Sequence, residues 1–212
     1  MMQGDATVGA ILDSLDRNQI SENTLVIVSS DNGAANHVYA PLRGAKTTIW
    51  EGGHRVPFFA RWKGTIKAES TCDNTVCLND LMATCAGLLE TKVPDNACED
   101  SVSFLPALLG KTNGSLREAT VHQSLGGDMA IRQGDWKLVF LKSGAKELYN
   151  LKEDLGETKN LAAEKADLVT NLSALLQQYI DKGRSTAGEP QLGSQGFPPA
   201  KGKAPKASAT PE

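Results

Sequence analysis

Three polar side chains in one irregular stretch of the sequence could do chemistry. Asp31 and Asn32 directly follow the apolar run 24–30, and Lys46 lies in the glycine-rich stretch 43–53. A carboxylate and an amide carbonyl side by side suit a hard cation such as calcium or magnesium, although calcium takes about six to eight oxygen ligands. A lysine ammonium group can face an anionic part of a substrate. A simple Asp-Asn-Gly turn and a solvated surface lysine are the alternatives.

Other residues with reactive side chains give weaker patterns. His37 lies between the acid–amide pair and Lys46 and could face a substrate, but a structural or incidental role is the simpler interpretation of both His37 and His54. The four cysteines, at positions 72, 77, 85 and 98, match no zinc-binding spacing. Their even number leaves disulfides and free thiols equally open.

The elements before and after this stretch predict an α/β arrangement. Residues 6–17 have apolar side chains at helical spacing, and residues 24–30 form an unbroken β-branched run that predicts a strand buried on both faces, as in a parallel sheet. Residues 56–62 are a second strand candidate. In open α/β sheets ligands bind beyond the carboxyl ends of the strands, which is where Asp31 and Asn32 stand.

The rest of the chain changes character along its length. Helices are predicted over residues 75–89 and 104–109. Short runs separated by glycine turns then predict a small antiparallel sheet, followed by an amphipathic helix over 161–180. The strands of that sheet are expected at 119–123, 129–132 and 136–141, with a possible fourth at 147–151. Residues 183–212 are rich in Gly, Pro, Ala, Ser and Lys, and they predict a disordered tail.

Composition excludes several classes of function. The chain has 212 residues, of which 40% are hydrophobic and 22% charged, with a formal net charge of −3. No basic face points to nucleic acid as a partner. No apolar run reaches the roughly 18 residues that a membrane span needs. The first ten residues, MMQGDATVGA, lack the features of a signal peptide, so the sequence by itself leaves the compartment undecided.

Long ordered motifs in this sequence resemble a known family. The runs TLVIVSSDNGA and PLRGAKTTIWEGGHRVPFFARWKG are similar to the C-terminal half of type I sulfatases, in the alkaline phosphatase superfamily. AIRQGDWKLVF and KELYNLKEDLGETKNLA resemble the closing antiparallel sheet of that family and the start of its last helix. The resemblance covers about residues 5–182. It implies part of an α/β sandwich with a mostly parallel sheet over 1–110 and a sheet-plus-helix subdomain over 111–182.

The resemblance also implies roles for individual residues. Asp31 and Asn32 would bind a divalent cation, usually calcium, and Lys46 would contact the sulfate as a catalytic and substrate-binding residue. His37 is a further candidate for contact with the substrate. The implied function is a sulfuric ester hydrolase, arylsulfatase-like, acting on an aryl or carbohydrate sulfate ester. Members of the family usually act in the periplasm, the lysosome or the medium.

One family feature is missing from these 212 residues. Type I sulfatases carry a C-x-[PSA]-x-R motif whose cysteine or serine becomes the formylglycine nucleophile, and none of the four cysteines has that context. We therefore expect a sulfatase fragment that is inactive alone, with the missing N-terminal portion as a possible partner. A truncated phosphatase or phosphodiesterase of the same superfamily, and a non-catalytic remnant that binds a partner chain, are the alternatives.

Overall fold

The computed structural model describes residues 2–191 of the chain. It contains five α-helices and six strands within that part. The helices are α1 (Met2–Arg17), α2 (Glu51–His54), α3 (Asp80–Leu88), α4 (Leu105–Leu108) and α5 (Ala166–Lys182). The strands are β1 (Val26–Ser29), β2 (Phe58–Arg61), β3 (Thr120–Gln123), β4 (Met129–Gln133), β5 (Trp136–Phe140) and β6 (Lys146–Asn150). None of the described helices combines the length and apolar character that a bilayer crossing requires.

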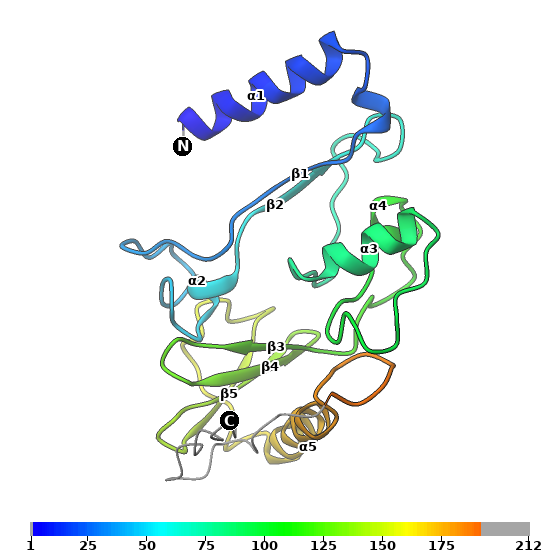
Figure 1. Ribbon diagram of the computed structural model, residues 1–212. Coiled ribbons are helices and arrows are strands. Elements are labelled where there is room, and N and C mark those ends of the chain that lie inside the picture. The colour runs from blue at the N-terminus through cyan, green and yellow to red at the C-terminus, as the bar shows by residue number, and fades with distance from the viewer. Residues whose placement is uncertain (1, 192–212) are drawn as a thin grey trace, which may run out of the picture.

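The first strand pairs differently from the expectation of a parallel neighbour. β1 pairs with β2 in antiparallel fashion, with Ile27 opposite Ala60. Val26, Ile27 and Val28 are only half-buried, and no described strand lies on the other edge of β1. The β-branched run was correctly predicted as a strand. Burial on both faces was wrong within the described chain, because β2 alone pairs with β1 and little packs over the pair (Figure 1).

The small antiparallel sheet is confirmed, and all four expected strands are present in the order β3-β4-β5-β6. Because side chains alternate along a strand, the sheet has two different faces. One face presents Ile131, Leu138 and Leu148 to the apolar side of α5, where Leu172 and Leu176 complete a core. Those five side chains are at most 2% exposed.

The opposite face of the same sheet carries the segment that precedes and includes α2. Ile49, which is 2% exposed, packs on Ala130 and Val139 together with Tyr149. Helix α5 and the α2 segment therefore cover the two faces of one sheet (Figure 1). The consequence for function is that the loop bearing Lys46 rests on strands more than eighty residues later in the chain, as the contact between Lys137 and Ile49 shows.

Two helices begin later than the sequence predicts. Helix α3 starts at Asp80 instead of residue 75, because the buried Asp80 carboxylate accepts the Cys77 backbone N–H (2.7 Å) and ends the preceding turn. Helix α5 starts at Ala166 instead of residue 161, because Leu161 donates its N–H to the Leu148 carbonyl (2.8 Å) and so extends the β6 side of the core.

The sequence-based domain boundary at residue 183 differs from what the structure describes. Arg184 is 4% exposed, and its guanidinium donates hydrogen bonds to the carbonyls of Asp95, Thr186 and Glu189. The packed part of the chain thus continues to Gln191, and the rest of the expected tail, 192–212, lies outside the described residues. All four cysteines are free thiols in the structure.

Candidate functional site

Two loops that are separate in the sequence form one unit in the structure. The Gly33 N–H donates to the Gly53 carbonyl (3.0 Å), and the Lys46 N–H donates to the Ala34 carbonyl (2.9 Å). A Cβ atom on Gly33 would overlap the Gly52 carbonyl oxygen, so glycine is what permits this close approach. The backbone thereby places the acid–amide pair and the lysine loop side by side. From the sequence, only the family resemblance predicted that these residues belong to one site.

Asp31 and Asn32 lie at the carboxyl end of β1. Asp31 is exposed, Asn32 is half-buried, and the Asn32 amide donates to the Asp31 carboxylate across 2.6 Å. Carboxylate and amide oxygens are the donors that calcium prefers, so the pair has the chemistry for part of a cation shell. Within residues 2–191 no group of three or more His, Cys, Asp or Glu is placed to hold a metal ion. These two residues therefore fit an incomplete shell.

The other two predicted site residues are exposed. Lys46 carries its ammonium group on the surface of the turn, and its backbone N–H is the one held by Ala34. His37 stands further along the first loop, edge-on to Tyr39 with ring centroids 4.7 Å apart. Neither side chain lines the neighbouring cleft, to which Asp31 alone of the four predicted residues contributes.

That cleft has a volume of about 460 Å³, and polar and apolar groups contribute about equally to its lining. Besides Asp31 it is lined by side chains of the α2 segment and of β3 and β4, among them His54, Arg55, His122 and Arg132. The His54 and His122 rings stack with their centroids 4.0 Å apart and their planes at 20°. The cleft thus joins the end of β1 to one face of the C-terminal sheet.

Glu51, which also lines the cleft, contacts several of these basic groups. Its carboxylate, 1% exposed, lies 3.0 Å from His54 Nε2, 2.7 Å from Arg55 Nε and 3.0 Å from Lys137 Nζ. Burial by itself would raise the pKa of Glu51, but the hydrogen bond with His54 and the charge of Lys137 outweigh it and hold that pKa far below its usual range. Glu51 is therefore an anion throughout the physiological range.

The histidine that faces His54 is kept neutral. Burial lowers the pKa of His122 well below its ordinary value, and the nearby His54, Lys137 and Arg132 lower it further. Burial likewise lowers the pKa of Arg132. His122, Arg132 and Lys137 were not singled out from the sequence. For Arg132 and Lys137 the available signal was a basic residue within a mostly apolar strand, whereas His122 lies in the mixed strand Thr120–Gln123 and carries no such signal.

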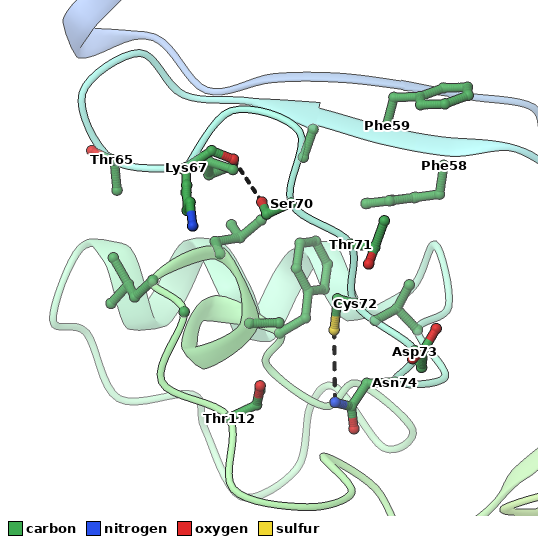
Figure 2. A pocket seen from close by; sticks show the side chains of 18 of the residues that line it. Phe58, Phe59, Thr65, Lys67, Ser70, Thr71, Cys72, Asp73, Asn74 and Thr112 are labelled. Carbon is green, nitrogen blue, oxygen red and sulfur yellow. Dashed lines mark hydrogen bonds between the residues drawn. The ribbon is translucent and has the colours of Figure 1, made fainter.

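A larger hollow of about 980 Å³ lies between β2 and α4 (Figure 2) and shares Phe58 and Cys72 with the cleft. Phe58 and Phe59 come from the strand, and the segment with Lys67, Ser70 and Cys72 closes one side. The charged side chains among its described lining residues are Lys67 and Asp73. Its mainly apolar wall offers less for catalysis than the more polar cleft beside Asp31.

Comparisons with known proteins show the family to which the chain is similar. The family model described as "Sulfatase" matches residues 1–91. An N-acetylgalactosamine-6-O-sulfatase of Bacteroides thetaiotaomicron is 31% identical over 207 residues, covering 84% of this chain and 40% of the relative. An N-acetylgalactosamine-6-sulfatase of Canis lupus familiaris is 36% identical over 145 residues, covering 64% of this chain and 27% of the relative.

Solved structures give the same answer for the fold. A protein from a study of glycosaminoglycan metabolism by Bacteroides thetaiotaomicron superposes with a TM-score of 0.73 at 31% identity, covering 83% of this chain and 42% of that one. The protein Ps i-CgsB, solved in complex with k-i-k-neocarrahexaose, gives a TM-score of 0.75 at 25% identity, covering 89% and 43%. The chain spans about two fifths of the length of these relatives. The expected fold class is confirmed, and the chain belongs to the sulfatase family, whose members it matches over their C-terminal portion.

Proposed function

We propose that these residues supply the cation-binding and sulfate-binding part of a sulfuric ester hydrolase site. In this proposal Asp31 and Asn32 hold one side of a calcium ion, and the Lys46 ammonium group contacts the sulfate. The observation that carries it is the pair of backbone hydrogen bonds, Gly33 to Gly53 and Lys46 to Ala34, that joins the two loops. Family membership supports the reaction type.

Cleavage of a sulfate ester is favoured by positive charge close to the sulfuryl group. Negative charge develops on the sulfuryl oxygens and on the leaving oxygen in the transition state. Lys46 would neutralise charge on the sulfuryl oxygens, and a bound cation supplies Lewis acidity there. The exposed position of Lys46 leaves its ammonium group open to an incoming anion.

The nucleophile is proposed to come from outside these 212 residues. The formylglycine motif that the family resemblance implies is not found in the sequence. Two oxygen donors from Asp31 and Asn32 also leave most of a calcium shell to other groups. We therefore expect the chain alone to bind sulfate weakly and to turn over no ester.

A sulfated carbohydrate is the proposed substrate class, in preference to an aryl sulfate. The relatives named above include N-acetylgalactosamine-6-sulfatases, and one neighbouring structure holds a carrageenan-type oligosaccharide. The cleft of about 460 Å³ beside Asp31 combines apolar surface with polar side chains that could bind the hydroxyl groups of a sugar ring. His37, which is exposed and does not line this cleft, remains a candidate contact with the substrate.

Binding of inorganic sulfate tests the proposal directly. We expect sulfate, titrated in the presence of calcium, to shift the NMR signals of the Lys46 side chain and of the 31–34 amides. Lys46→Ala should abolish the shifts at 31–34, whereas Lys67→Ala, at another exposed lysine, should leave them intact. Equal shifts in both variants, or shifts only with phosphate, would contradict a sulfate site at Lys46.

A further inference from the structure

The most deeply buried charge in the described chain belongs to a residue that the proposed chemistry does not use. Lys137 in β5 is 0% exposed. Its ammonium group donates to the Ile49 carbonyl (2.9 Å), the Glu51 carboxylate (3.0 Å) and the Glu157 carboxylate (2.7 Å). All three N–H donors are satisfied, which is the condition for a charge to be tolerated in such a place.

Two of the three acceptors belong to the loop that bears Lys46. Ile49 follows Lys46 within this loop, and Glu51 ends the loop as the first residue of α2. Glu157 also contacts this loop directly, because the carboxylate oxygen that does not bind Lys137 accepts the Glu51 backbone N–H (2.7 Å). Lys137 thus holds the Ile49 carbonyl and the Glu51 side chain, while Glu157 holds the Glu51 backbone N–H.

Arg43 ties down the start of the same loop. Its guanidinium donates to the Glu157 carbonyl (3.1 Å) and the Tyr149 hydroxyl (3.0 Å), and it lies 3.4 Å from the centre of the Trp50 ring. The segment from Arg43 to Glu51 is therefore fastened at both ends to residues of β5, β6 and the turn after β6.

The same segment makes the backbone hydrogen bonds to residues 31–34, which are called the cation loop below. The Gly52 N–H donates to the Arg43 carbonyl (2.8 Å), which closes the segment on itself. Gly53 and Lys46 then make the two hydrogen bonds to Gly33 and Ala34. The backbone position of Lys46 beside Ala34 therefore depends on where Glu51 is held.

We propose that Lys137, acting through Glu51 and Glu157, is a positioning residue that fixes the Lys46 loop against the cation loop. The C-terminal sheet then does more than cover an apolar core: it sets the geometry of the anion site. The inference rests on the proposed function where it concerns sulfate, and on the contacts alone where it concerns the loop.

The choice of variant matters because replacing Lys137 alone would leave a buried carboxylate without its counter-ion. Lys137→Met alone leaves the Glu157 carboxylate buried without its counter-ion, which is strongly destabilising. The double variant Lys137→Met/Glu157→Gln removes both charges and keeps an oxygen that can accept the Glu51 N–H. Neutral replacement of a buried pair is far better tolerated than removal of one member.

The matched control lies one residue away. Leu138 is also 0% exposed, but its side chain points to the opposite face of β5, into the α5 core. Leu138→Ala therefore destabilises the same strand without touching the Glu51 network. Any effect of the double variant that Leu138→Ala reproduces is a general loss of stability.

Amide hydrogen exchange, followed by NMR without sulfate or calcium, is the decisive measurement. In the double variant we expect the Gly33, Lys46 and Gly52 amides to exchange about tenfold faster or more, while the β4 and β5 amides change little, because the loop opens locally. Leu138→Ala should instead accelerate the β4 and β5 amides at least as much as the loop amides. Unchanged loop exchange in the double variant, or a pattern equal to the control, would overturn the proposal.

The sulfate titration then separates the two inferences. If sulfate binds the unmodified chain, the double variant should bind it at least about tenfold more weakly, as expected for a loosened loop that must be ordered on binding. Loosened exchange with unchanged sulfate affinity would overturn the positioning role for Lys46. If the unmodified chain binds no sulfate, the proposed function fails, and the exchange experiment still decides whether Lys137 holds the loop.

Discussion

At the scale of single residues, the cleft shows how one buried anion organises several bases. Glu51 lies within 3.0 Å of nitrogen atoms of His54, Arg55 and Lys137, and these contacts keep it ionised. His122 stacks on His54, and its pKa is lowered first by burial and then by the neighbouring basic groups. The lowered pKa belongs to the histidine that β3 supplies to the stacked pair.

The lowered pKa of His122 predicts a pH dependence of stability. In the unfolded chain this histidine takes up a proton as pH falls through about 6.5, whereas in the folded chain it resists protonation. The unfolded state then binds more protons, so the free energy of unfolding should fall below pH 6.5 by up to about 1.4 kcal/mol per pH unit. Urea denaturation at several pH values between about 5 and about 7, a range that brackets the ordinary histidine pKa, would measure the slope.

Two variants assign that slope to its residue. His122→Asn should flatten the pH dependence, because the titrating group between Glu51, His54, Arg132 and Lys137 is removed. His37→Asn, at an exposed position, should leave the slope as it is. A slope that survives His122→Asn would show that another group is responsible.

At the scale of elements, the site depends on two loops approaching as closely as backbones can. Gly33 faces the Gly52 carbonyl, and Gly53 faces the Thr48 carbonyl, with no room for a Cβ atom at either glycine. The strand β1 and helix α2 bring the loops to this place, but the glycines allow them to make hydrogen bonds. Such close approach is a packing requirement and involves no unusual backbone angle at Gly33 or Gly53.

Gly33→Ala should separate the loops. The added methyl group overlaps the Gly52 carbonyl, so we expect a loss of about 1–3 kcal/mol in the free energy of unfolding. The Lys46 amide should also exchange faster, because its acceptor Ala34 moves with residue 33. Gly9→Ala in α1, where nothing lies within 4 Å of the added methyl group, is the control and should cost no stability. Equal effects of the two changes would rule out the close approach as the cause.

The elements themselves were largely accessible from sequence. The pattern of β3 to β6 follows from short alternating runs and glycine turns, and the structure confirms all four strands. The β1 strand was found from its β-branched residues, but its partner was not, because periodicity describes a strand's own faces and not the direction of its neighbour. The starts of α3 and α5 were missed by about five residues, since Asp80 and Leu161 are held by contacts distant in the sequence.

The site was accessible only in part for the same reason. Asp31, Asn32 and Lys46 are marked by an ordered motif, and the structure brings their loops together. Their roles as cation and sulfate contacts remain a prediction. No local pattern indicates that Lys137 and Glu157 contact Glu51, because they lie 86 and 106 positions after it in the chain.

At the scale of the whole molecule, the N-terminal helix and the C-terminal sheet differ in how firmly they are packed. Helix α1 contacts mainly the short 3-10 turn Ser21–Asn23 and stands apart from the other elements (Figure 1). Its apolar residue Ile11 is 48% exposed. Helix α5 buries Leu172 and Leu176 against the sheet.

Hydrogen exchange measured by mass spectrometry should reveal this contrast. We expect the amides of α1, residues 2–17, to exchange far faster than those of α5, residues 166–182, although the two helices have 16 and 17 residues. Helices of that length are marginal in water without packing. Protection of α1 equal to that of α5 at every protein concentration would contradict the picture, whereas protection that grows with concentration would indicate association through α1.

The alternation of β5 has a consequence for how this chain can vary. Lys137 faces Glu51 and the neighbouring Leu138 faces α5, so a shift of β5 by one residue would exchange them. The ammonium group would then enter an apolar core, and a leucine would stand against two carboxylates. Insertions or deletions of a single residue within β4, β5 or β6 should therefore be far less tolerated than changes in the length of their connecting turns, which makes the register of this sheet a constraint on the chain's evolution.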